Sequence, residues 1–223
     1  MNKKLESVQT DTGRYYLSPK TGKWYPSVTT VVNHETEAFW AEWRKDPKNA
    51  AISKRACARG NSVHGMVEEY LKEGVVPDGP IDVMRFNILK PYLDRITKIY
   101  AIEDTLYSDQ ILMAGRLDCM GDYDGEISVI DFKTSSKEKT ASQIKNYFHQ
   151  ATAYSIMWEE MYGQPVNKIV ILILTEEGTL QEFVRDASEY RKSMLKVAKG
   201  YWEKNSFKSV QEKANELYSK TAR

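Results

Sequence analysis

The stretch "GRLDCMGDYDGEISVIDFKTS", residues 115–135, carries the clearest β-hairpin signal in the chain. Asp124-Gly125 favours a two-residue turn, because the reversed turn between twisted strands needs a positive φ, which glycine adopts without a Cβ clash. Apolar, β-branched and aromatic residues flank the turn over 117–123 and 127–134. Both flanks are therefore predicted to be strands.

The two-residue turn also fixes the register of this hairpin, since it pairs Tyr123 with Glu126. Counting away from the turn places Asp118 opposite Asp131, and the period of two in a strand places Lys133 on the same face as Asp131. Facing carboxylates destabilise a strand pair by an amount comparable with the ~0.2–1 kcal/mol of a good pair. A divalent cation would offset this repulsion, since Mg²⁺ prefers one or two carboxylates plus waters and phosphate oxygens. The alternative is a strand end with its charges in water.

The length and composition indicate a single globular domain. The chain has 223 residues, of which 41% are hydrophobic and 28% charged, enough for one sizeable core. Its N-terminus is polar and no apolar run approaches the ~20 residues of a membrane span, so neither secretion nor membrane insertion is expected. Cys57 and Cys119 are too few for a disulfide framework and lack the CxxC spacing of zinc sites, which suits a reducing cytoplasm.

The net charge of +1 means that any binding of nucleic acid must come from local groups of basic residues. Two such groups precede and follow the hairpin, and they comprise Lys45, Lys48, Lys54, Arg55 and Arg59, then Lys137, Lys139 and Lys145. Both are candidates for phosphate contact, and the alternative for each is a solvated helix face. Tyr25 and Trp40 near the first group are candidates for base stacking, with core packing as the alternative.

The hydrophobic pattern predicts a mixed α/β sheet covered by helices. Helices are expected over about 49–73, 82–100, 141–161 and 187–217, and strands over 105–108, 168–174 and 179–184. An aromatic hairpin around Thr21-Gly22 is expected ahead of them, followed by a helix capped by Ser27 and a helix that ends at Pro47. We divide the domain into an aromatic hairpin and helical part (1–104), a sheet core (105–186) and a C-terminal helix (187–223).

Three polar residues lie on helix faces that are predicted to point inward. His64 shares its face with Gly60 and Glu68, and it is either a hydrogen-bonded core residue or a ligand. Glycine inside a helix costs ~1 kcal/mol relative to alanine, which suggests that something packs closely against Gly60. Gln150 and Tyr154 are neighbours at i and i+4, and together they could hold a phosphate or a base. The alternative is a core tyrosine with a glutamine at its rim.

Four short segments occur in a fixed order along the chain: "VHGMVEEYL", "GRLD", "DFK" and "QATAY". This order and spacing resemble the RecB-like branch of the PD-(D/E)xK nuclease superfamily and, within it, the mitochondrial genome maintenance exonucleases. The resemblance covers about residues 27–157. It implies a restriction-endonuclease-like core, in which helices flank a mixed central β-sheet. It also implies a Mg²⁺- or Mn²⁺-dependent exonuclease that hydrolyses phosphodiester bonds of single-stranded DNA from a free end.

The resemblance also implies roles for individual residues. The expected catalytic residues are Asp118, Asp131 and Lys133, with Lys133 activating the attacking water. The expected metal ligands are His64, Asp118, Asp131 and the carbonyl of Phe132. The residues expected to contact DNA are Gln150, Tyr154, Ser135 and Lys137. Glu68 follows the histidine by four residues and is a candidate for a supporting role beside the ligands.

Two features of some relatives are not expected here. Several RecB-like nucleases hold an iron–sulfur cluster with four cysteines, and this chain has two cysteines in total. It also lacks a GxxxxGK[ST] stretch, so we expect no helicase motor within it.

Two alternative functions stay open from the sequence. One is a structure- or site-specific DNA endonuclease, because the same core serves both kinds of enzyme. The other is a catalytically silent module that binds DNA ends, although the intact Asp118, Asp131 and Lys133 argue against it. We expect a monomer whose partner is single-stranded DNA, with other replication or recombination proteins as further candidates and no membrane. The resemblance suggests DNA repair or recombination in the cytoplasm of a bacterial or phage-infected cell.

Overall fold

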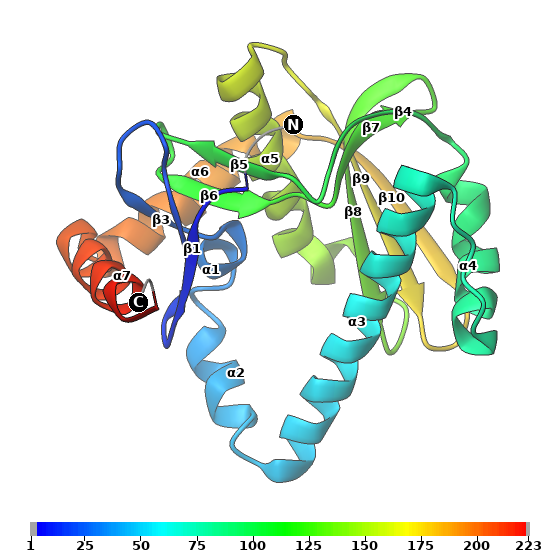
Figure 1. Cartoon of the computed structure of the whole chain (residues 1–223), viewed down its shortest axis with the longest axis horizontal. Helices are drawn as coiled ribbons and strands as arrows, with labels where there is room; N and C mark the ends of the chain where they lie inside the picture. Colours follow the sequence, from blue (N-terminus) through cyan, green and yellow to red (C-terminus); the bar gives the residue numbers. More distant parts are fainter. Residues whose placement is uncertain (1–3, 222–223) are drawn as a thin grey trace.

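A mixed five-stranded sheet forms the centre of residues 4–221, the part of the chain that the computed structural model describes (Figure 1). Its strand order is β10-β9-β8-β7-β4. These strands are β4 (Ile96–Ile102), β7 (Cys119–Tyr123), β8 (Glu126–Ser135), β9 (Lys168–Thr175) and β10 (Leu180–Asp186). β8 and β9 run parallel, and the other neighbours are antiparallel. The predicted mixed α/β core is therefore confirmed.

Helices cover both faces of this sheet. On one face α3 (Pro47–Glu73) and α4 (Pro80–Leu93) bury apolar side chains against Phe132 and its neighbours on β8 and β9. On the other face α5 (Lys145–Tyr162), which follows the short helix η1 (Ala141–Ile144), and α6 (Ser188–Lys204) pack against Val129 and β9. β9 is buried on both faces, as its continuous apolar run predicts.

Smaller elements stand beside the central sheet. A three-stranded sheet joins β1 (Ser7–Thr10), β2 (Gly13–Leu17) and β3 (Trp24–Pro26), and a two-stranded sheet joins β5 (Thr105–Ser108) and β6 (Met113–Arg116). α7 (Phe207–Thr221) packs on the N-terminal sheet through Val210 and Ala214. α1 (Val28–Val32) and α2 (Glu37–Trp43) lead from that sheet to α3, and α2 and α3 form the arms of a V (Figure 1).

The hairpin has the predicted register, but its pairing is one residue shorter than expected. Tyr123 pairs with Glu126, and the turn residues Asp124 and Gly125 have φ of +52° and +79°. The pairing stops at Cys119 opposite Ile130, so Asp118 lies just outside the ladder and not opposite Asp131. The strand ends there because the Asp118 side chain takes up the next amide: its Oδ2 accepts a hydrogen bond from Phe132 N at 2.9 Å.

Several expectations about the helices are confirmed. The Ser27 side chain caps α1 by accepting a hydrogen bond from Thr30 N, and α3 ends at Gly74, whose φ is +70°. None of the helices in the described residues is long and apolar enough to cross a membrane.

Other boundaries were wrong. The helix expected over 82–100 ends at Leu93, and Ile96–Ile102 is strand β4, so the central sheet begins before residue 105. The single C-terminal helix is broken, because Asn205 is extended between α6 and α7. Strand β6 was not predicted.

The expected crowding at Gly60 is wrong, and for Tyr25 the alternative of core packing is confirmed. A Cβ at Gly60 would find its nearest neighbour, Thr134 Oγ1, at 3.8 Å, which is an ordinary contact and not the expected crowding. Tyr25 is buried and donates a hydrogen bond to Asp109, so it is a core residue that cannot stack on a base.

Candidate active site

A cavity of about 710 Å³ lies where β8 runs on beyond the end of β7. We call it the site cavity. Its walls come from β2, α3, the end of β6 and α5. The predicted site residues that line it are His64, Glu68, Asp118, Lys133, Gln150 and Tyr154. The fold thus brings residues from four separate segments of the chain to one place.

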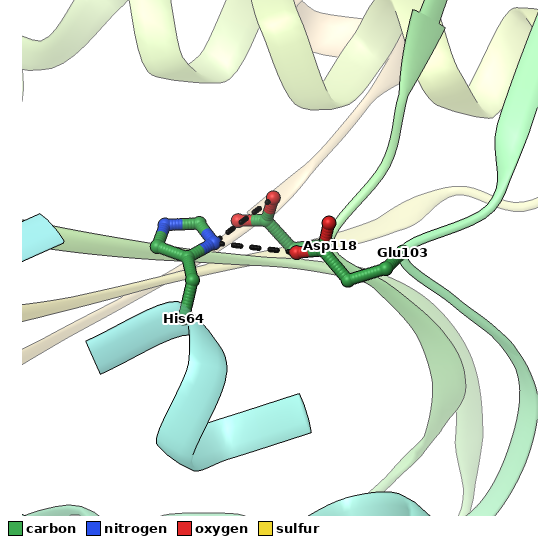
Figure 2. A group of neighbouring side chains, drawn as sticks. All are labelled: His64, Glu103 and Asp118. Atoms are coloured by element: carbon green, nitrogen blue, oxygen red, sulfur yellow. Dashed lines mark hydrogen bonds and ion pairs between the residues drawn. The ribbon is translucent and has the colours of Figure 1, made fainter. Parts of the chain in front are cut away.

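One nitrogen and two carboxylates converge at the centre of this cavity (Figure 2). His64 Nδ1 lies 3.5 Å from Glu103 Oε1 and 3.6 Å from Asp118 Oδ1. One ligand atom from each of the three residues lies within 4.8 Å of the others. His64 projects from α3, whereas the two acids come from the ends of β4 and β6.

Glu103 was not predicted. It is buried, although glutamate is rarely buried without a partner, and its backbone has φ of +51°, an uncommon value outside glycine. The Oε2 of Glu103 lies 2.7 Å from Arg116 Nε, and the backbone amide of Glu103 donates a hydrogen bond to Asp118 O at 3.0 Å. A buried acid with a left-handed backbone conformation, whose carboxylate and amide are both bonded to residues 116–118, is typical of a functional position.

The cluster favours positive charge at its centre. Burial lowers the pKa of His64, but Glu103 and Asp118 more than offset this effect, so the pKa lies above its usual value. Carboxylate oxygens suit Mg²⁺ and Mn²⁺, and imidazole is a common additional metal ligand. The donor set therefore fits a divalent cation.

Asp131 lies beside this cluster but has different partners. Lys133 Nζ contacts Asp131 Oδ1 and Oδ2 at 2.6 Å each, and Gln150 Nε2 donates to Oδ1 at 3.0 Å. Burial raises the pKa of Asp131 to about 6, although Lys133 opposes the shift. The pKa of Lys133 is also raised: burial lowers it, but Asp131 and Asp118 outweigh that effect. Because a buried carboxylate takes the nearest positive charge, this acid is paired with the lysine and not with His64.

The glycine of the "GRLD" segment has a steric role. A Cβ at Gly115 would lie 2.8 Å from Tyr154 Oη, closer than side chains tolerate, and 3.1 Å from Val28 Cγ2, which would have to shift by a few tenths of an ångström. Tyr154 in turn donates a hydrogen bond to Arg116 O at 2.7 Å, next to the segment that carries Asp118. Burial raises the pKa of Tyr154 well above its usual value, so the phenol keeps its proton as a donor.

The remaining predicted residues lie at the margin of the site. The Phe132 amide donates to Asp118, and the carbonyl of the same residue points to the same side of the strand, while the ring is in the core. Glu68 lines the cavity and pairs with Lys72 Nζ at 2.5 Å. Ser135 Oγ donates a hydrogen bond to Lys137 O at 2.6 Å, which holds the loop after β8 in place. The Lys137 side chain is exposed and lies outside the cavity.

Sequence reasoning also missed Arg116 and the residues that β2 contributes, Arg14 and Tyr16. A signal for Glu103 exists: Glu103-Asp104 is an acidic pair between two strand-like runs, "ITKIYAI" and "TLYS". Reading the first run as a strand would have placed these acids at a strand end, where polar functional residues are common.

Comparison with known proteins identifies the family. A profile of the PD-(D/E)XK nuclease superfamily matches residues 84–221, more than half of the chain. The matched part contains Glu103, Asp118, Asp131 and Lys133, whereas α3 with His64 precedes it. No curated protein matches the chain.

Two solved structures are similar at low sequence identity. The "putative exonuclease" of Eubacterium rectale is 10% identical with a TM-score of 0.47, over 69% of this chain and 67% of that one. The protein SSO0001 is 16% identical with a TM-score of 0.43, over 81% of this chain and 76% of that one. The profile match covers the central sheet and both hairpin acids. The chain therefore belongs to the PD-(D/E)XK nuclease superfamily.

Proposed function

We propose that this nuclease is a metal-dependent exonuclease that hydrolyses single-stranded DNA from a free end. The observation that carries the proposal is the site cavity itself, in which the metal-ligand cluster lies between walls from distant parts of the chain. Arg14 and Tyr16 of β2 form one wall, His64 and Asn61 of α3 form another, and the V of α2 and α3 joins the two sides covalently (Figure 1). A volume of about 710 Å³ is within the usual size of small-ligand sites, which suits the end of an unpaired strand.

His64, Glu103 and Asp118 would hold the divalent cation, with Asp131 as a neighbouring carboxylate. When bound, the cation would supply Lewis-acid chemistry, polarising the phosphate and stabilising the negative charge that develops during hydrolysis. The finer resemblance to the mitochondrial genome maintenance exonucleases, carried by the four segments quoted above, supports the choice of Mg²⁺ or Mn²⁺.

The residues around the cluster hold its parts in place. Asp131 fixes the Lys133 ammonium, and Gln150 fixes Asp131 in turn. Because the raised pKa keeps Lys133 charged near neutral pH, we assign it to bind a phosphate oxygen and orient the attacking water. Tyr154 and the Phe132 amide fix the segment and the carboxylate of Asp118.

Exposed aromatic residues on α2 support a single-stranded substrate. Phe39 is 63% exposed and Trp40 42% exposed, and Trp40 contacts both Phe39 and Trp43 edge to face. Stacking of a base on such a ring is worth ~1–3 kcal/mol and requires an unpaired strand. Since one chain supplies every wall of the cavity, we also propose that the enzyme acts as a monomer.

The test compares four substrates in the presence of Mg²⁺ or Mn²⁺: linear single strands, covalently closed single-stranded circles, blunt duplex and linear RNA. We expect fast cleavage of linear single-stranded DNA, slow cleavage of blunt duplex and no cleavage of circles. The Lys133→Ala variant serves as the control for a contaminating nuclease. Efficient cutting of circles would replace the proposal with an endonuclease. Binding of DNA ends without cleavage of any substrate would replace it with a silent end-binding module.

A further inference from the structure

One edge of β8 is open beyond the site. Residues 131–135 pair with β9 on one side, and pairing with β7 on the other side stops at Ile130. Lys133 on this segment lines the site cavity, whereas Thr134 and Ser135 line a second cavity of about 850 Å³. The two cavities therefore follow one another along about 7 Å of the same strand, from Lys133 to Ser135 at about 3.3 Å per residue.

The second cavity is rich in positive charge, and we call it the basic cavity. Among the residues that the structure places around it, four are basic and one is acidic: Arg55, Arg59, Arg85 and Lys139, with Glu176. They come from α3, α4 and the loops after β8 and β9. The two groups of basic residues that the sequence shows before and after the hairpin thus contribute to one cavity.

The positive charge in this cavity is only partly compensated. Arg59 pairs with Glu176 through Nη1, and Arg85 Nη1 lies 3.3 Å from Asp82 Oδ1. Within the described part of the chain the buried Nε of Arg59 has no hydrogen-bond partner. Burial and the neighbouring Arg85 lower the pKa of Arg59, which means that its surroundings disfavour the charge it carries. Arg55 is exposed at the rim. An anion in the cavity would supply the missing counter-charge.

Tyr147 connects the two cavities. Its side chain lines the basic cavity, and its ring lies 5.3 Å from Lys133 Nζ of the site cavity. Alanines 56 and 58 of α3 leave room on the opposite wall. A chain of phosphates that is bound at Lys133 therefore meets further positive charge in the direction of Ser135.

We propose that the DNA strand held at Asp118 and Lys133 continues along the open edge of β8 into the basic cavity, where Arg55, Arg85 and Lys139 bind its phosphodiester backbone. The contact is with phosphate and so is independent of base sequence. This inference rests on the proposed function, since it assigns the path of the substrate beyond the same site.

The test measures binding in place of cleavage. The probe is a fluorescein-labelled oligothymidylate, titrated at several salt concentrations with a chelator present so that it is not cut. We compare the Arg55→Gln/Lys139→Gln variant with the control Lys192→Gln/Lys213→Gln, which removes the same charge from exposed residues of α6 and α7 outside the lining of both cavities. Each lost phosphate contact should reduce the slope of log K against log salt by ~0.7. The cavity variant should therefore lose up to about 1.4 in slope, whereas the control should keep the wild-type slope.

A second variant protects the test against misfolding. Ser136 is exposed and lines the basic cavity, so Ser136→Asp adds a negative charge there without removing a packed side chain. It should weaken oligothymidylate binding, with a wild-type melting temperature.

Two results would overturn the inference while leaving the proposed function in place. One is a wild-type salt slope in the cavity variant together with normal binding by Ser136→Asp. The other is an equal loss of slope in the cavity variant and the control. A wild-type protein that neither binds the oligonucleotide nor cuts it with Mg²⁺ or Mn²⁺ would instead remove the proposed function, and the inference with it.

Discussion

Two charges of opposite sign lie along β8, one beside each cavity, and the surroundings of each disfavour its charged form. In the site region burial raises the pKa of Asp131 to about 6, whereas in the basic cavity burial, followed by Arg85, lowers the pKa of Arg59. Each shift disfavours the charged form of the group. An acid in this position is stabilised by a cation, and an arginine by an anion. The contrast teaches that one end of the edge suits a metal ion and the other a phosphate, the two components that a nuclease must bring together.

The largest expected effect is a loss of cleavage when the site cavity is changed, whereas a change in the basic cavity should weaken only DNA binding. Lys133→Ala should lower the rate of cleavage of linear single-stranded DNA on the order of 10²- to 10⁴-fold, because it removes the charge fixed beside the cluster. Lys139→Gln in the basic cavity should lower the rate only at low substrate concentration, through weaker binding. Initial rates over a range of DNA concentrations measure both. Equal losses at saturating DNA would break the comparison.

The next effect concerns the metal ligands. Glu103→Gln and His64→Asn should each raise the Mg²⁺ or Mn²⁺ concentration needed for half-maximal activity, by roughly 10- to 100-fold. Glu69→Gln, an exposed acid on α3, is the charge-matched control and should leave the requirement unchanged. Melting temperatures measured with a chelator report on folding. A large fall in melting temperature with an unchanged metal requirement would make His64 a core histidine.

The part of the site that sequence predicted is local in the chain. Asp118, Asp131 and Lys133 lie within sixteen residues around a single two-residue turn. The turn residues fix the register of the hairpin, and the two-residue period of a strand then places these side chains near one another. His64 required only the face of one helix and the family pattern.

The rest depended on contacts between distant segments. Ile96 and Ile99 keep a helical spacing with the preceding helix, and only pairing with β7 decides that they form a strand, so the buried Glu103 at the end of that strand was missed. The break at Asn205 carries no glycine or proline. It follows from the docking of α7, where the Gln211 side chain bonds both the amide and the carbonyl of Trp24, at 2.8 and 2.7 Å. The basic cavity likewise gathers residues between 52 and 176.

Two glycine substitutions test how closely the side chains pack around the site, without changing any charge. Gly115→Ala should destabilise the protein by about 1–3 kcal/mol, because its Cβ would overlap Tyr154 and Val28. Gly60→Ala, at the helix position between the cavities, should stabilise it by about 0.5–1 kcal/mol, since the nearest atom is 3.8 Å away and alanine favours the helix. Urea unfolding of both variants measures the two signs. A loss of stability in Gly60→Ala would mean that the space there is filled.

The last expected effect is a pH dependence that belongs to Asp131. Its pKa is about 6 in the folded protein and near the ordinary 3.8 in the unfolded chain, so the folded state binds more protons between these values. The free energy of unfolding should therefore fall as the pH rises from about 4 to 6, by on the order of 1–2 kcal/mol relative to a variant that cannot titrate. Asp131→Asn is that variant.

The measurement is the difference in unfolding free energy between wild type and Asp131→Asn, with a chelator present, from pH 4 to 7. The difference removes the contribution of the shared groups whose pKa does not depend on Asp131. Asp131 raises the pKa of His64, so His64 contributes to the difference with the same sign. Arginine stays protonated throughout this range, so Arg59 gives no matching slope and the basic cavity keeps its charge. Divalent cation should abolish the effect if Asp131 faces the bound ion, because the carboxylate then keeps its charge at no cost. A difference that rises with pH would show that Lys133 already satisfies the acid completely, and the contrast between the two cavities would then rest on the basic cavity alone.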